Sequence, residues 1–236
     1  MALKRFLLDH NLLIGIGLLA FLGLQSAAVG AARDSGWKLS KQGNEPGNHF
    51  ELYRRDVAGS GYDRYRLETV VDEPIERVIQ AVQIRSVDDQ YLDEGLTRSV
   101  FHRADGDDSL TYFEMRLPFI KDRDVALRTK RGYDEELGVY RDEWWTANDE
   151  VPPPSKDFVR MTKSEGFWEI TSADENHTHV VYESHADPGG RVPSWIANSI
   201  LGDQVIGQIV TLRRILDDHR TDVASPPPRA SSSFRN

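Results

Sequence analysis

Cysteine is absent from the 236-residue chain, which excludes disulfide bonds, thiolate metal sites and a cysteine nucleophile. An excess of positive charge is absent too. The formal net charge is −9 and no basic cluster offsets it, so the chain lacks the attraction with which proteins bind nucleic acids. What is present is an ordinary globular composition, 39% hydrophobic and 28% charged. The length suits one domain with appendages.

The first 32 residues have the order of a secretory signal peptide. Basic residues precede an apolar run at 12–24, and small residues follow at 26–32. The alternative is an uncleaved membrane anchor, because residues 12–32 contain only Gln25 and Ser26 as polar side chains and about 20 apolar residues span a bilayer. A buried core helix is a third possibility. With a signal peptide or an anchor, we expect an extracytoplasmic protein, either periplasmic or secreted.

Alternating apolar side chains and short turn sequences predict a series of antiparallel strands. Pro152–Pro154 cannot pair inside a sheet, so they predict a stiff excursion between two strands. The segment 36–48 predicts a loop or a short helical lead-in, and the Pro- and Ser-rich tail 224–236 predicts disorder. The strands are expected at two places within 49–72 and at 96–102, 110–117, 125–133, 138–146, 157–164, 166–172 and 179–185, with a helix at 75–83.

The stretch 185–219 predicts one long terminal helix after a rigid turn. Apolar side chains recur three or four residues apart from Ile196 to Leu216, which is the spacing of one helix face. So apolar a face needs a large partner surface, and the sheet is the obvious one. The predicted fold class is therefore α+β, a curved antiparallel sheet wrapped around a long C-terminal helix.

Four segments in this order resemble one known family. They are 65–75, a strand that leads into Val-Asp-Glu-Pro-Ile-Glu at 71–76; Leu-Pro at 117–118 before Lys-Asp-Arg-Asp-Val at 121–125; Asp-Phe-Val-Arg at 157–160 before Gly-Phe-Trp at 166–168; and Asp-Pro-Gly-Gly-Arg-Val-Pro-Ser-Trp at 187–195. Together they resemble the START lipid-transfer domain, a helix-grip fold, over residues 36–219. Asp88–Tyr91 and Val125 depart from the family's usual residues.

The resemblance implies that one lipid or sterol-like molecule binds between the sheet and the terminal helix. It implies no catalysis and no cofactor, transient contact with a membrane, and a monomer. A lid that closes over an apolar ligand needs a hinge, and the turn before the helix supplies one. The hinge is predicted at Asp187, Pro188, Gly189, Gly190 and Pro193.

Polar side chains inside such a cavity would hold the ligand's head group. The resemblance places a carboxylate–arginine pair there, at Glu114 and Arg128. The alternative is that both lie on the solvated face, since charged residues are mostly exposed. The predicted ligand-binding residues are Tyr112, Glu114, Arg116, Arg128, Trp145, Trp195, Ile196 and Ile200.

Other functions find less support in the sequence. Ser184, His185 and Asp187 have the residue types of a catalytic triad but lie too close together to converge. His177 and His179 would share a strand face without a third metal ligand. Two alternatives stay open: a polyketide cyclase-like enzyme on the same fold, and a protein-interaction module whose cavity is filled by side chains.

Overall fold

The structure is a computed structural model that describes residues 36–45, 48–93, 95–103, 108–116 and 120–220. The chain divides into two units, 1–38 and 39–236, and the account below concerns the second. The predictions for residues 1–32 and 224–236 lie outside the described residues. No helix in the described ranges is long and apolar enough to cross a membrane.

Ten strands, two α-helices and two short 3-10 helices make up the described chain, in an order close to the predicted one. They are β1 (Lys38–Glu45), β2 (Asn48–Arg55), β3 (Arg64–Val71), α2 (Ile75–Val87), η1 (Asp89–Tyr91), β4 (Leu96–Arg103), β5 (Asp108–Met115), β6 (Asp122–Asp134), β7 (Val139–Thr146), η2 (Asn148–Glu150), β8 (Phe158–Arg160), β9 (Lys163–Ser172), β10 (Thr178–Asp187) and α3 (Ser194–Asp218).

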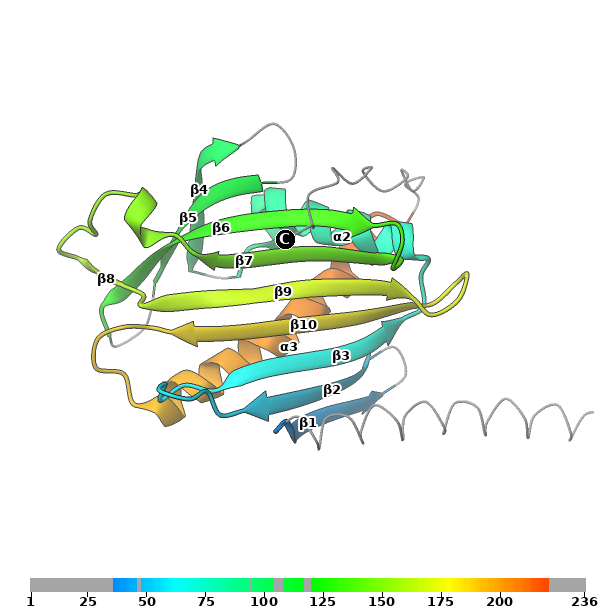
Figure 1. Ribbon diagram of the computed structural model, residues 1–236, viewed down its shortest axis with the longest axis horizontal. Coiled ribbons are helices and arrows are strands. Elements are labelled where there is room, and N and C mark those ends of the chain that lie inside the picture. The colour runs from blue at the N-terminus through cyan, green and yellow to red at the C-terminus, as the bar shows by residue number, and fades with distance from the viewer. Residues whose placement is uncertain (1–35, 46–47, 94, 104–107, 117–119, 221–236) are drawn as a thin grey trace, which may run out of the picture. The chain divides into compact units, whose positions relative to one another are not determined.

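The ten strands form one curved sheet. Nine follow the order β1-β2-β3-β10-β9-β7-β6-β5-β4, and β8 pairs with β6 off this path (Figure 1). Strands adjacent in the chain mostly pair as hairpins, as predicted. The exceptions are β7 with β9, β6 with β8, and β3 with β10, the last of which joins the first part of the sheet to its last strand. Alpha-helix α2 carries the chain from β3 to the far edge at β4. This is the predicted helix-grip architecture.

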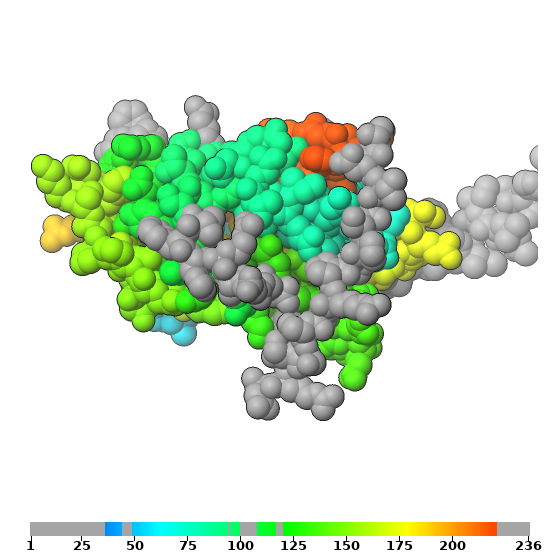
Figure 2. All heavy atoms as spheres, turned by 90° about the horizontal axis from the view of Figure 1, so that it is seen from above, coloured from blue at the N-terminus to red at the C-terminus, as the bar shows by residue number. Residues whose placement is uncertain are grey.

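The long helix α3 lies against one face of the sheet, with α2 beside it (Figures 1 and 2). Its buried residues include Leu201, Val205, Ile209 and Leu212, which recur at the predicted helical spacing. They join one core with apolar side chains of the sheet and of α2. The core covers the middle and C-terminal part of α3, whereas its first turn is exposed.

Both ends of α3 are held by hydrogen bonds to the rest of the fold. At the N-terminal end, the Asn198 side chain accepts from the Asp63 backbone N–H at 3.0 Å. At the C-terminal end, Arg77 of α2 donates to the Leu216 and His219 carbonyls at 3.1 and 3.2 Å. Helix C-termini leave such carbonyls unpaired, so Arg77 caps α3.

Two expectations about local structure were wrong. Part of the segment 36–48 is strand β1 and not a loop or helix, because it pairs with the edge of β2. The strand expected at 157–164 is only the three-residue β8, which runs parallel to β6. A tight hairpin can join only antiparallel strands, so β8 needs a longer connection to run parallel to β6, and the excursion with the three prolines is part of that connection.

A second, smaller core lies on the other face of β5 and β6. It contains Leu110, Ala126 and Ala147, with Tyr112 and Val151 packed against it. The excursion after β7 covers this face, and its Asn148 side chain accepts from the Ala126 N–H at 3.1 Å. Both faces of these strands are therefore covered in part, which bears directly on the placement of the site.

Candidate ligand-binding cavity

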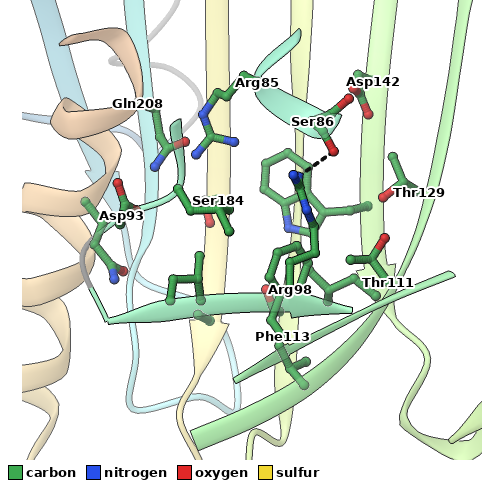
Figure 3. A pocket seen from close by; sticks show the side chains of 18 of the residues that line it. Arg85, Ser86, Asp93, Arg98, Thr111, Phe113, Thr129, Asp142, Ser184 and Gln208 are labelled. Atoms are coloured by element: carbon green, nitrogen blue, oxygen red, sulfur yellow. Dashed lines mark hydrogen bonds between the residues drawn. The ribbon is translucent and has the colours of Figure 1, made fainter. Parts of the chain in front are cut away.

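A cavity of about 230 Å³ lies between the sheet, α2 and α3. Its apolar wall includes two tryptophans, Trp144 and Trp168, and aliphatic side chains from β6 and α3. Its polar side chains gather in part near the C-terminal end of α2 (Figure 3). The polar lining residues are Arg85, Ser86, Asp93, Arg98, Ser109, Thr111, Thr129, Arg131, Asp142, Ser164, Tyr182, Ser184, Gln204 and Gln208.

The strand period decides which residues line the cavity. On β5 the lining residues have odd numbers, Thr111, Phe113 and Met115 among them, and on β6 they run from Val125 to Arg131 in steps of two. Successive side chains of a strand point to opposite faces. Even-numbered residues of β5 and β6 therefore point away from the cavity.

One charged group stands in the cavity wall on β7. The Asp142 side chain is almost fully buried, and Oδ2 lies 3.9 Å from Nε of Arg131, its cross-strand neighbour on β6. Burial raises the pKa of Asp142 to about 6, although the positive charges of Arg131 and Arg85 lower it. Desolvation is thus stronger here than the attraction of the two arginines.

The lining arginines differ in how they are bonded. Arg98 donates to the Ser86 carbonyl at 2.5 Å, drawn as a dashed line in Figure 3, and to Asp89. By contrast, the buried Nε atoms of Arg85 and Arg131 have no hydrogen-bond partner among the described residues. The same is true of Oε1 of Gln208, whose side chain enters the cavity from α3.

The four predicted residues on β5 and β6, or just beyond, do not line the cavity. The Tyr112 hydroxyl donates to Oδ2 of Asp124 at 2.8 Å in the second core. Arg128 pairs with Glu150 of the excursion, its Nε 2.9 Å from Oε1. Glu114 lies opposite Asp124 in the β5–β6 register, not opposite Arg128, so the expected pair does not form. Arg116 is exposed and pairs with Asp122 at 3.0 Å.

The predicted tryptophan and helix residues also lie outside the cavity wall. Trp144 lines the cavity, and its neighbour Trp145 points to the other face of β7 with 42% of its surface exposed. Trp195 and Ile200 are 74% and 43% exposed near the start of α3. Ile196 is partly buried there without lining the cavity. The helix lines the cavity instead with Leu201, Gln204, Val205 and Gln208.

The predicted hinge is a bonded turn at the start of the connection to α3. Oδ1 of Asp187 accepts from the Gly189 N–H at 2.9 Å. The buried Arg123 donates to the Pro188 and Gly189 carbonyls at 2.8 and 3.3 Å. Gly190 and Pro193 follow this bonded part. Motion at the hinge stays a prediction.

The triad residue types do not converge. Ser184 lines the cavity, whereas His185 points to the opposite face of β10, where Nδ1 lies 3.2 Å from the Asp63 carbonyl oxygen. Burial lowers the pKa of His185. Among the described residues, no group of three or more His, Asp or Glu side chains is arranged to hold a metal ion.

Sequence reasoning missed Arg85, Arg131 and Asp142. A signal for Asp142 was available, because it shares strand parity with Tyr140 and Trp144 and so belongs to the apolar face of β7. A charged residue on an apolar face is a candidate for a role in a cavity. No sequence signal connects Arg85 with it, because the two lie 57 positions apart in the chain.

The sequence pattern of the START domain family matches residues 25–222. The chain belongs to the START family. An uncharacterized protein of Pseudomonas aeruginosa is 27% identical over 201 residues, which cover 84% of this START protein and 96% of the relative.

Solved structures agree with the fold. A STAR-related lipid transfer protein fragment from Xanthomonas axonopodis matches with a TM-score of 0.64 at 24% identity, covering 77% of this START protein and 99% of the fragment. Human StAR-related lipid transfer protein 5 matches with a TM-score of 0.65 at 16% identity, covering 85% and 99%. At 24% and 16% identity, these structures support the helix-grip fold of this START protein.

Proposed function

We propose that this protein binds a single lipid or sterol-like molecule, without catalysis, in the cavity between the sheet, α2 and α3. The observation that carries the proposal is the cavity itself, with an apolar wall that includes Trp144 and Trp168 and a polar end formed by charged side chains. A mainly apolar pocket with a few polar groups is typical of sites that bind small amphiphilic molecules. Apolar burial would supply the affinity, at about 25 cal/mol per Å² removed from water.

Native mass spectrometry of the purified protein, followed by uptake of fluorescent phospholipid, sterol and fatty acid, tests this proposal. We expect a co-purified lipid or saturable uptake of one class. Leu127→Trp would fill the cavity, because Leu127 lines it, and should abolish uptake. Val70→Trp is the matched control, since Val70 is 41% exposed on β3. Equal uptake by both variants, or no lipid bound by the unmodified protein, would contradict the proposal.

We further propose that the first turns of α3 contact a membrane when the ligand enters or leaves. The side chains of Trp195 and Ile200 support this, because both are large, apolar and exposed and tryptophan favours the membrane interface. Trp195→Ala should lower the rate of lipid transfer between vesicles several-fold and leave equilibrium lipid binding within twofold. An unchanged transfer rate would remove the membrane role of this turn.

The proposal also includes delivery out of the cytoplasm by residues 1–32, supported by their basic, apolar and small-residue order. Cell fractionation with mass determination of the mature N-terminus distinguishes a cleaved signal peptide from an anchor. A full-length protein in the cytoplasmic fraction would contradict both forms of the proposal.

A further inference from the structure

Four polar side chains from four different elements meet at one end of the cavity. Arg85 comes from α2, Arg131 from β6, Asp142 from β7 and Gln208 from α3. Figure 3 shows Arg85 and Gln208 directed into the pocket from the two helices, with Asp142 on the sheet side. The Arg131 guanidinium lies 3.9 Å from Asp142, and Arg85 is near enough to act on the charge of Asp142.

Several hydrogen-bonding atoms of this cluster have no partner among the described residues. Nε of Arg85, Nε of Arg131 and Oε1 of Gln208 are buried without a hydrogen-bond partner among the described residues, and Gln208 is only 6% exposed. A buried polar group without a partner costs about 1–3 kcal/mol, and a charged group costs more. By contrast, the guanidinium group of Arg160, which lies elsewhere in the fold, donates to the Asp124 carboxylate and to the Pro152 carbonyl.

Positive charge is concentrated around Asp142. Two guanidinium groups, Arg131 and Arg85, act on its carboxylate, whereas Arg98 is bonded to Asp89. A further lining carboxylate, Asp93, follows η1 and lies on the same side of the pocket as Gln208 and Arg85 in Figure 3. An anionic oxygen placed between the two arginines would accept from their unpartnered Nε donors.

From this arrangement we propose, resting on the proposed function, that the ligand is an amphiphile whose anionic group is bound by Arg85 and Arg131. Guanidinium groups bind carboxylate, sulfonate or phosphate oxygens more strongly than neutral hydroxyls. The apolar wall formed by Trp144, Trp168 and Leu127 receives the hydrocarbon part. The volume of about 230 Å³ lies below the roughly 300–1,000 Å³ common for pockets that enclose drug-sized ligands, which favours a single hydrocarbon chain.

Asp142 makes this binding depend on pH. The charged groups that act on it are Arg131 on β6, Arg85 on α2 and Glu143 beside it in the chain. The titratable Tyr182 on β10 also interacts with it, and α3 contributes the uncharged Gln208 to the same pocket. A bound anion repels the ionised carboxylate and so favours its protonated form. Because the pKa of Asp142 in the unliganded protein is about 6, affinity should be constant below pH 6. It should fall above that pH, by at most about tenfold per pH unit for one proton.

The test compares dodecane-1-sulfonate with dodecan-1-ol, two probes with the same chain but a charged or a neutral end. Both are titrated below their aggregation limits, with tryptophan fluorescence or calorimetry as the measurement. The sulfonate stays ionised between pH 5 and 8, so its own titration does not enter. Inorganic sulfate is a third probe and separates binding of a free anion from binding of an amphiphile.

We expect the sulfonate to bind at least tenfold more tightly than the alcohol at pH 6, and inorganic sulfate to compete only weakly. Arg85→Gln and Arg131→Gln should each lower sulfonate affinity about tenfold or more and change alcohol affinity less than threefold. Arg116→Gln, an exposed arginine off the cavity, should change neither. Sulfonate affinity should fall from pH 6 to pH 8 in the unmodified protein but stay constant in Asp142→Asn.

Each other outcome has a definite meaning. Equal binding of sulfonate and alcohol, or equal losses for both probes in the arginine variants, would overturn the anionic ligand while lipid binding stands. Sulfate that competes as well as the sulfonate would overturn the amphiphile. Binding of neither chain would contradict the proposed function itself. Should an arginine variant fail to fold, the comparison of probes and the pH profile with Asp142→Asn still decide.

Discussion

The buried ion pair between Arg160 and Asp124 provides a strong test of how the sheet is held to the excursion after β7. Asp124 is fully buried, and its Oδ2 accepts from Nε and Nη2 of Arg160 at 3.0 and 2.9 Å and from the Tyr112 hydroxyl. This carboxylate and burial together raise the pKa of Tyr112 to about 12, with burial the larger cause. Arg160 also donates to the Pro152 carbonyl at 2.9 Å.

Arg160→Met removes the cation and leaves the carboxylate of Asp124 in the protein interior. Breaking a buried pair from one side costs about 3–5 kcal/mol. Arg128→Met is the matched control, because Arg128 joins the same excursion through Glu150 at the surface, where ion pairs contribute about 0–1 kcal/mol. The free energy of unfolding, measured by urea denaturation at pH 7, should therefore fall by at least 2 kcal/mol more in Arg160→Met than in Arg128→Met.

A second substitution identifies the cause of the loss. Asp124→Asn introduced into Arg160→Met removes the uncompensated charge and should recover about 1 kcal/mol or more of stability. The reasoning is refuted if the two single variants differ by less than 1 kcal/mol. It is refuted as well if the double variant is less stable than Arg160→Met, because a buried charge would then not be the source of the loss.

Three further predictions follow from other parts of the structure. Gly189→Ala should destabilise the folded protein by at least about 1–2 kcal/mol in thermal unfolding, because φ is +65° and a Cβ would lie 2.6 Å from the Arg160 carbonyl oxygen. Gly207→Ala should instead stabilise α3 by up to about 1 kcal/mol, since nothing lies within 4 Å of the new atom. The opposite order of stabilities would contradict this reasoning. Asp142→Asn should flatten the pH dependence of the free energy of unfolding. In the unmodified protein the folded-state pKa of about 6 lies above the unfolded value of about 3.9, so stability is lost as pH rises through pH 4–6, by about 3 kcal/mol at most. Parallel curves for the two proteins would rule this out. Trp144→Phe should reduce the change in tryptophan fluorescence on ligand binding, with Trp168, which also lines the cavity, giving the remainder. Trp145→Phe should leave the change as it is, and equal loss in both variants would mean that the cavity is not where the ligand lies.

Local patterns were enough to predict most of the elements. The alternation in β3 and the three-to-four spacing of α3 each follow from burial of one face, and burial of one face leaves a period in the sequence. The segment that became β1 lacked such a period, because an edge strand is held by backbone hydrogen bonds that any side chain permits.

The predicted ligand-binding residues of β5 and β6 lie on the face away from the cavity for a related reason. Both faces of these strands carry apolar side chains, since the excursion after β7 builds a second core around Ala126. With both faces partly covered, alternation shows that a strand exists but not which side is the cavity. Glu114 and Arg128 therefore satisfied the pattern and still lie outside the cavity wall.

The sequence by itself determined the family, the helix-grip order of elements and the long apolar face of α3, because these depend on residues that are close in the chain. Only the tertiary structure decided which strand face lines the cavity and that Arg85, Arg131 and Asp142 meet there. These three side chains come from α2, β6 and β7, and their meeting depends on how α2 packs against the sheet. Packing of that kind follows from contacts between distant segments, which leave no local pattern in the chain.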